Sequence, residues 1–283
     1  IISSAGALIT LDLLKSSGVE SAGKIPWAGA VRGEVSGSER CPHIKQGISH
    51  MSCFVGLEGS AEDLGLVRHN QWILPVKEGA NPDLEQMCNQ YYTEQLEAFK
   101  TTANQSPMIF LGFPSAKDPS HAERHPSKST CVMVCEAKTE WFDQWRGVGR
   151  SGHRKSPEYT ALKQEYLNMC ISTMNRLFPK TKGKVVYSDI GSPLSNEHYL
   201  NRAASYGLEP SCARFTCDSM AALRPQVDGV PGLYMVGQDV ATMGWAGALS
   251  SAMMTSMAIL GYGFWDLVIC NRNLIKDLRN VPV

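Results

Sequence analysis

The stretch "PGLYMVGQDVATMGWAGALSSAMM", residues 231–254, decides how this chain is interpreted. It begins as a short apolar strand, passes through a glycine-containing turn and continues as a helix of small residues. Glycine has no Cβ, so Gly237, Gly244 and Gly247 suit positions where the backbone passes close to another group. The pattern therefore predicts a strand and a helix that meet at a turn built for close approach.

Composition limits the classes of protein to consider. The chain has 283 residues, with 27 Lys+Arg balanced by 27 Asp+Glu, so its formal net charge is zero. Nucleic-acid binders usually carry a basic surplus, and this balance argues against that class. Hydrophobic residues make up 43%, as in an ordinary globular protein. The length suffices for one large domain or two smaller ones.

Cysteine and histidine patterns do not indicate a metal site. The nine cysteines are an odd number without a C-x-x-C pair, which favours mostly buried thiols in a reducing compartment over disulfides or zinc. His121 and His125 have the spacing of two helical metal ligands, but the first lacks an adjacent Glu and Pro126 follows the second. We interpret them as surface histidines and predict no metal.

The remaining segments mix strands and helices without a strict βαβ rhythm. The opening "IISSAGAL" reads as a strand that enters a turn, as in the middle of a protein, and a short helix follows it. This suggests a processed chain, a split polypeptide or a sequence holding only the ordered part. This order of strands and helices fits an α+β domain that is inserted into another domain, so that both of its ends return to that other domain. Alternation predicts a strand at 48–59, and further strands are predicted at 107–119, 129–137 and 184–191. Start signals predict helices at 81–100 and 156–179, and a run of small residues predicts a helix at 246–260.

Two other segments need an interpretation. "GVGRSG", residues 147–152, matches G-x-G-x-x-G but follows a polar aromatic segment instead of a strand, so we predict a solvated basic loop. Residues 245–265 are uncharged, yet their Ser, Thr and Gly content favours a buried helix over a membrane span. Residues 264–279 form an amphipathic pattern, which fits either a terminal helix packed on the body or an interfacial helix on a bilayer.

The turn at 231–254 also resembles a known signature. "GLYMVGQDVATMGWAGAL" is similar to the C-terminal signature of the flavoprotein superfamily of retinol saturase, carotenoid isomerase and phytoene desaturase. Further segments resemble retinol saturase most closely and follow that family's order. They are "IISSAGAL", "FPSAKDPSHAERHPSKST", "TEWFDQW", "GSPLSNEHYL", "YGLEP" and "LRPQVDGVPGLY".

The resemblance implies an α/β fold in three segments. Residues 1–15 would be a returning strand and turn of a Rossmann-like FAD-binding domain, 16–225 an α+β substrate-binding domain, and 226–283 the C-terminal FAD-binding strand and helix with the terminal amphipathic helix. The family's N-terminal strand–GxGxxG–helix unit, which binds the ADP half of FAD, is absent from these residues. The implied flavin contacts are Gly237, Asp239, Gly244, Trp245, Ala246 and Gly247.

Two functions from different classes follow. The first is the C-terminal half of a FAD-dependent oxidoreductase that saturates or isomerises a retinoid or carotenoid, paired with a chain that carries GxGxxG. Tyr206 and His198 are its weak catalytic candidates, because they lie in segments that resemble the family's substrate-facing motif. The second is an inactive accessory subunit of a larger membrane-associated assembly. The family's membranes are those of the endoplasmic reticulum and the plastid, and both stay open.

Overall fold

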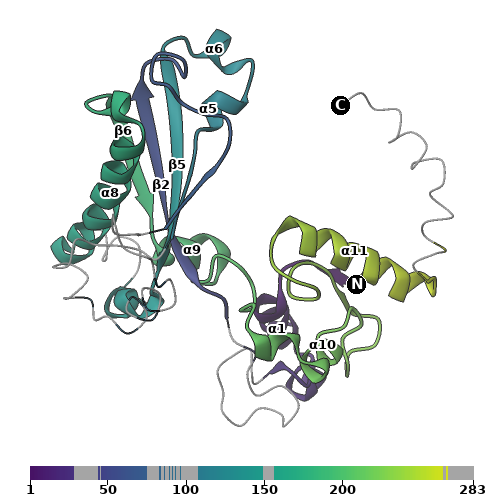
Figure 1. Ribbon diagram of the computed structural model, residues 1–283. Coiled ribbons are helices and arrows are strands. Elements are labelled where there is room, and N and C mark those ends of the chain that lie inside the picture. Colours follow the sequence, from purple (N-terminus) through teal and green to yellow (C-terminus); the bar gives the residue numbers. More distant parts are fainter. Residues whose placement is uncertain are drawn as a thin grey trace. The chain divides into compact units, whose positions relative to one another are not determined.

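The computed structural model describes residues 1–28, 44, 46–74, 108–148 and 156–263, with positions 83, 86, 89, 91, 93, 96 and 266 (Figure 1). The chain divides into two compact units. Unit 1 comprises residues 1–47 and 206–283, and unit 2 comprises residues 48–205. Both contain helices and sheet, which confirms the predicted α/β class. The unit boundaries lie inside the segment 16–225, and the assignment of segments to substrate and flavin domains stays a prediction.

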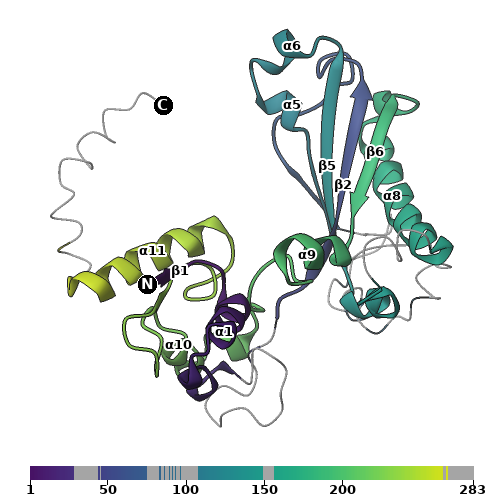
Figure 2. The ribbon, with the colours of Figure 1, turned by 180° about the vertical axis from the view of Figure 1, so that it is seen from behind.

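Unit 2 is built on a five-stranded antiparallel sheet with the order β3-β4-β5-β2-β6. The strands are β2 (Ser49–Glu58), β3 (Gln71–Ile73), β4 (Ile109–Gly112), β5 (Lys128–Ala137) and β6 (Val185–Gly191). The helical elements of this unit are α5 (Pro114–Lys117), α6 (His121–Arg124), η2 (Thr139–Trp145), α8 (Pro157–Leu177), η3 (Pro179–Thr181) and α9 (Pro193–Leu200). From the front and from behind, α8 lies alongside β6 (Figures 1 and 2).

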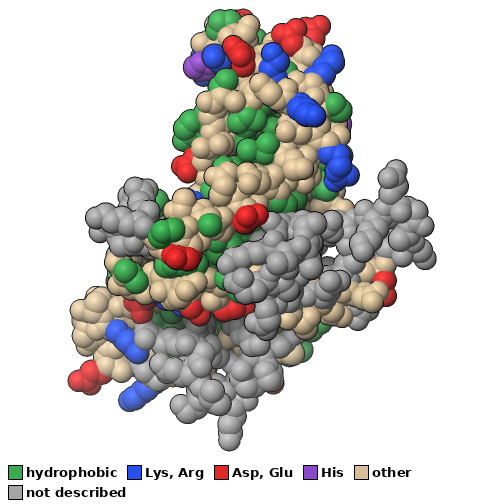
Figure 3. Space-filling view, turned by 90° about the vertical axis from the view of Figure 1, so that its left-hand side faces the viewer, with side chains coloured by type: hydrophobic (Ala, Val, Ile, Leu, Met, Phe, Trp, Pro, Cys, Tyr) green, Lys and Arg blue, Asp and Glu red, His purple; other side chains and the backbone are tan. Residues whose placement is uncertain are grey.

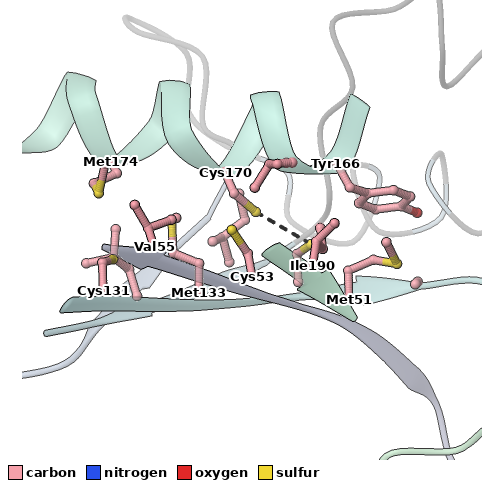
Figure 4. Close-up of a cluster of buried hydrophobic side chains, with 14 of the residues drawn as sticks. Met51, Cys53, Val55, Cys131, Met133, Tyr166, Cys170, Met174 and Ile190 are labelled. Carbon is pink, nitrogen blue, oxygen red and sulfur yellow. Dashed lines mark hydrogen bonds between the residues drawn. The ribbon is translucent and has the colours of Figure 1, made fainter. Parts of the chain in front are cut away.

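One face of this sheet packs against α8. Ser156 caps the helix by accepting a hydrogen bond from the Tyr159 N–H, and Pro157 occupies the first turn, where its missing N–H costs nothing. The inward residues of α8 include a stripe with a spacing of four residues, Leu162, Tyr166, Cys170 and Met174. Alternate residues of β2 and β5 meet that stripe, as Figure 4 shows.

Sulfur is concentrated in this core. Cys53, Cys131, Cys135 and Cys170 are buried and free, and the Cys135 and Cys170 sulfurs lie 3.9 Å apart. A hydrogen bond with Cys170, together with burial, raises the pKa of the Cys53 thiol. Burial raises the pKa of Cys131 to about 12. These groups therefore behave as small apolar side chains, as the sequence predicts, whereas Cys212 and Cys217 are exposed.

The opposite face of the sheet, which we call the open sheet face, is apolar and accessible. Cross-strand register places Phe54 opposite Val132 and Phe110 opposite both Val134 and Trp72. The open sheet face comprises Phe54, Trp72, Phe110, Val132, Val134 and Tyr187, of which Phe54, Trp72 and Tyr187 are exposed. Viewed from the side of unit 2 that carries α8 and β6, hydrophobic side chains also reach the surface in the upper part of Figure 3.

Unit 1 joins the two ends of the described chain. β1 (Ile2–Ser3) pairs in parallel with β7 (Tyr234–Met235), which lies more than 230 residues later in the sequence. Its helical elements are α1 (Ala7–Ser16), η1 (Glu20–Lys24), η4 (Cys212–Phe215), α10 (Cys217–Ala222) and α11 (Gly244–Leu260). Leu11, Trp27, Leu223 and Met235 belong to its separate core.

Some predicted elements differ in extent. The apolar run at 107–119 is a strand only over 109–112, because Pro114 begins the short helix α5. The predicted helix at 81–100 lies largely outside the described residues. The helix predicted at 246–260 runs over Gly244–Leu260, but it is buried only along the stripe Gly247, Ser251 and Thr255. Its small residues therefore do not reflect burial on every side.

Helix α8 provides a matched test of the unit 2 core. Leu162 is fully buried, whereas Leu177 near the end of the same helix is 39% exposed. We expect Leu162→Ala to lower the free energy of unfolding by about 2–5 kcal/mol, because it leaves a cavity. Leu177→Ala should change it by about 0.5 kcal/mol. Denaturant unfolding measures both, and equal losses would contradict this core.

The thiols provide a second test. At pH 8 Cys131, with a pKa of about 12, is almost entirely the unreactive thiol, and it is also shielded from reagent. We expect iodoacetamide to alkylate Cys212 and Cys217 in the native protein and to reach the four buried cysteines only after unfolding. Peptide mass mapping reads each site. Native labelling of Cys131 as fast as Cys212 would be inconsistent with this core.

Candidate functional site

The predicted flavin-facing turn lies between β7 and α11 in unit 1. Two hydroxyls of α11 fasten the helix to the end of the strand. The Gly237 N–H donates to Ser251 Oγ over 2.7 Å, and the Thr255 hydroxyl donates to the Met235 carbonyl over 2.8 Å. Ser251 and Thr255 are both buried. The position of the helix start is thus fixed by side-chain bonds to the strand end.

Close approach explains one of the glycines. A Cβ at Gly247 would lie 1.7 Å from the carbonyl oxygen of Thr242, a distance that no side chain tolerates. Gly237 and Gly244 instead have φ values of 115° and 81°, the region that glycine enters without strain. The sequence prediction of a tight backbone turn is therefore confirmed, and the neighbour of Gly247 is the chain itself.

The start of α11 is open. Met243 precedes the helix and makes no side-chain capping bond, and a Cβ built at Gly244 would meet no atom within 4 Å beyond its chain neighbours. Trp245 is 80% exposed, and Ala246 is exposed as well. The first-turn N–H groups of a helix carry positive partial charge. This uncapped start can receive an anionic group, and Gly244 and Ala246 on either side of Trp245 are small.

Asp239 makes contacts within the chain that the sequence did not predict. Its carboxylate is buried and accepts the Ala7 N–H over 2.7 Å on Oδ2 and the Leu208 N–H over 2.8 Å on Oδ1. The Arg214 guanidinium donates to the Asp239 main-chain carbonyl over 2.6 Å. Asp239 thus caps α1 and ties three segments together. Sequence reasoning missed these partners, because they lie 232 and 31 residues away.

The two weak catalytic candidates lie in different units. Tyr206 belongs to unit 1 and is partly exposed, whereas His198 lies on α9 in unit 2. His198 lines a cavity of about 420 Å³ at the end of β6, together with Phe54, Asp189 and Tyr199. The His198 and Tyr199 rings meet edge to face at 4.8 Å. A catalytic role for either candidate stays a prediction.

The accessible part of the turn is the start of α11. Gly244, Trp245 and Ala246 present an accessible helix start that suits the anionic edge of a flavin ring. Gly237 N–H, Gly247 and the Asp239 carboxylate are engaged with the chain itself. Gly244, Trp245 and Ala246 are thus accessible to a ligand, whereas the contacts of the other three groups fix the turn. Direct flavin contact by Asp239 stays a prediction.

The histidine pair of the sequence analysis lies at the short helix α6. His121 lies in the short helix α6, His125 follows it, and no group of metal-ligating side chains occurs among the described residues. Within the same described part, none of the helices has both the length and the apolar character to cross a bilayer. Most of the loop at 147–152 and almost all of the segment 264–279 lie outside it.

Comparison with known proteins gives a consistent set of relatives. The chain is 34% identical to the human protein named all-trans-retinol 13,14-reductase over 255 residues, 87% of this chain. It is 33% identical to the zebrafish (Danio rerio) protein of that name over 219 residues. It belongs to the retinol saturase family. No family model matches it.

Two features of the comparison limit what carries over from the retinol saturases. The chain spans 38% of the human relative and 34% of the zebrafish relative. A further zebrafish protein, 28% identical over 218 residues, is named inactive all-trans-retinol 13,14-reductase. The relatives of this chain therefore include proteins named for the reductase activity and one that is named inactive.

Asp239 provides the test of the turn. We expect Asp239→Asn to lower the free energy of unfolding by about 1–3 kcal/mol, because the amide NH₂ would face one of the two buried N–H donors. Asp228→Asn is the control, since Asp228 only forms an exposed ion pair with Arg224. Denaturant unfolding measures both variants. Equal small effects would show that the Asp239 bonds do not hold unit 1 together.

Proposed function

We propose that this chain is the C-terminal part of a FAD-dependent oxidoreductase that saturates a double bond of a retinoid. The names of its relatives support the substrate and the reaction type. A reduced flavin, when bound, supplies a hydride equivalent to a carbon–carbon double bond. The residues of this chain would bind, orient and shield the reactants.

The observation that carries this proposal is the uncovered surface of α11. The 17 residues of the helix include no charged side chain, yet Leu249 is 56% exposed and Leu260 is 55% exposed. A helix with an apolar outer side is normally covered by other structure. The β1–β7 pair is also parallel, an arrangement usually buried on both faces of a larger sheet.

The occupant that we infer for this surface is the flavin-binding remainder of a retinol saturase-like protein. Support comes from length, because the matched relatives are more than twice as long as the matched segment. That remainder would bring the GxGxxG unit and bind the ADP half of FAD. The helix start at Gly244, Trp245 and Ala246 would face the ring and stabilise negative charge that develops on it.

The open sheet face of unit 2 is our proposed surface for the polyene. Its aromatic and branched side chains include Phe54, Phe110 and Trp72, and the Trp72 and Phe110 rings meet edge to face with their centroids 5.1 Å apart. Such a surface would bind a flat conjugated chain and exclude water from it. Proton delivery by His198 or Tyr206, and membrane attachment through residues 264–279, are further proposals.

A second candidate function is an accessory subunit without catalysis. It is favoured by the zebrafish relative that is named inactive. In this alternative the apolar side of α11 would bind other subunits instead of a flavin domain. The two functions differ in whether flavin accompanies the chain.

The test is to purify the tagged chain from its native cells and identify every polypeptide that accompanies it by mass spectrometry. We expect flavin absorbance bands, a polypeptide with GxGxxG and consumption of all-trans-retinol. Leu249→Asp should remove both the polypeptide and the flavin, because it places a charge in the apolar contact. Leu13→Asp is the control, since Leu13 is 54% exposed on α1 of the same unit.

Each outcome distinguishes the candidates. Unrelated subunits without flavin would favour the accessory function and overturn the proposed one. A fully active Leu249→Asp variant would show that the α11 surface is not the contact. Circular dichroism of both variants would confirm that the chain itself stays folded.

A further inference from the structure

The cavity at the end of β6 in unit 2 carries an inference that rests on the proposed function. Four of its lining residues, Ser52, Phe54, Asp189 and Gly191, lie on the same side of the sheet as the open sheet face. Register shows this, because Phe54 pairs with Asp189 and Ser52 pairs with Gly191. Tyr159 and Lys163 of α8 line its other side, so the cavity lies at the edge strand β6, where the open sheet face meets α8.

The shape of this cavity comes from three elements. The capping box of α9, in which Ser192 and Ser195 exchange side-chain bonds with each other's backbone, fixes the helix just after β6. Tyr159 of α8 adds a 2.7 Å hydroxyl–hydroxyl bond to Ser192. These bonds hold α8 and α9 at the end of the strand. The resulting space of about 420 Å³ is in the usual range for small-molecule sites.

Polar groups of both signs line the cavity. The Lys163 ammonium lies 5.8 Å from the centroid of the Tyr159 ring, and Asp189 Oδ1 accepts the Ile190 N–H over 2.8 Å. A carboxylate has a second oxygen, which can accept a hydrogen bond from an alcohol. The exposed rings of Phe54 and Tyr199 form the apolar part of the wall.

We propose that this cavity binds the hydroxyl end of the retinoid whose polyene lies on the open sheet face. Asp189 would accept the alcohol proton in a hydrogen bond, and Lys163 would donate to the alcohol oxygen. One positive and one negative group together suit a neutral alcohol. A retinoid carboxylate would be attracted by Lys163 and repelled by Asp189, so Asp189 would set the preference for the alcohol.

The test compares two probes, all-trans-retinol and all-trans-retinoic acid, in binding to the full chain and to its purified assembly. Quenching of tryptophan fluorescence gives both dissociation constants. We expect Asp189→Asn to shift the affinity ratio toward retinoic acid about fivefold, because the repulsion is removed. Lys163→Met should shift the ratio the other way. Asp63→Asn is the matched control, since Asp63 is an exposed carboxylate of unit 2 that lies outside this cavity and bonds Ser60.

The outcomes separate this inference from the function on which it rests. If neither probe binds the assembly, both the inference and the proposed retinoid activity are wrong. If both probes bind but the ratio is the same in the wild type, Asp189→Asn and Lys163→Met, the retinoid binds with its polar end elsewhere, and this inference alone is overturned. An equal shift in Asp63→Asn would assign the effect to general surface charge and also overturn it.

Discussion

The buried carboxylate of Asp239 is the interaction on which unit 1 depends. It accepts two backbone N–H groups, one at the start of α1 and one at Leu208, while its own carbonyl accepts from Arg214. Buried backbone donors left without acceptors are costly, so this single side chain satisfies groups from segments far apart in sequence. Because Asp239 lies in the turn before α11, the same contacts fix where that helix begins.

Unit 2 shows how one sheet serves two purposes. Its inner face packs thiols, methionines and α8 into a core in which a hydrogen bond with Cys170 and burial raise the thiol pKa of Cys53, and burial raises that of Cys131. Its other face carries aromatic side chains at the surface, which a stable core does not require. Strand alternation lets the two faces vary independently, since each substitution on one face leaves the other unchanged. A rigid inner face would hold the outer face in place for binding.

Helix α11 also has two sides with different roles, one bonded to the chain and one exposed. Its narrow buried stripe includes Ser251 and Thr255, which bond Gly237 just after β7 and Met235 in β7, while large apolar residues such as Trp245, Leu249 and Leu260 are exposed. This is the reverse of an ordinary surface helix. The arrangement is understandable if the outward side meets further protein or a cofactor, as in the proposed function. Stability of the chain alone gives no reason for an exposed Trp245 and Leu249.

The sequence by itself determined the elements and the turn. Alternation predicted β2, and an apolar run bounded by turn residues predicted β5. Ser156–Pro157 predicted the start of α8, and the glycines at 237, 244 and 247 predicted the turn before α11. All of these signals are local. Only the tertiary structure decided that Asp239 binds Ala7 and Leu208, that large apolar residues of α11 are exposed, and that His198 and Asp189 line one cavity. Each of these depends on contacts between segments far apart in the chain, and no local period or turn pattern encodes such partners.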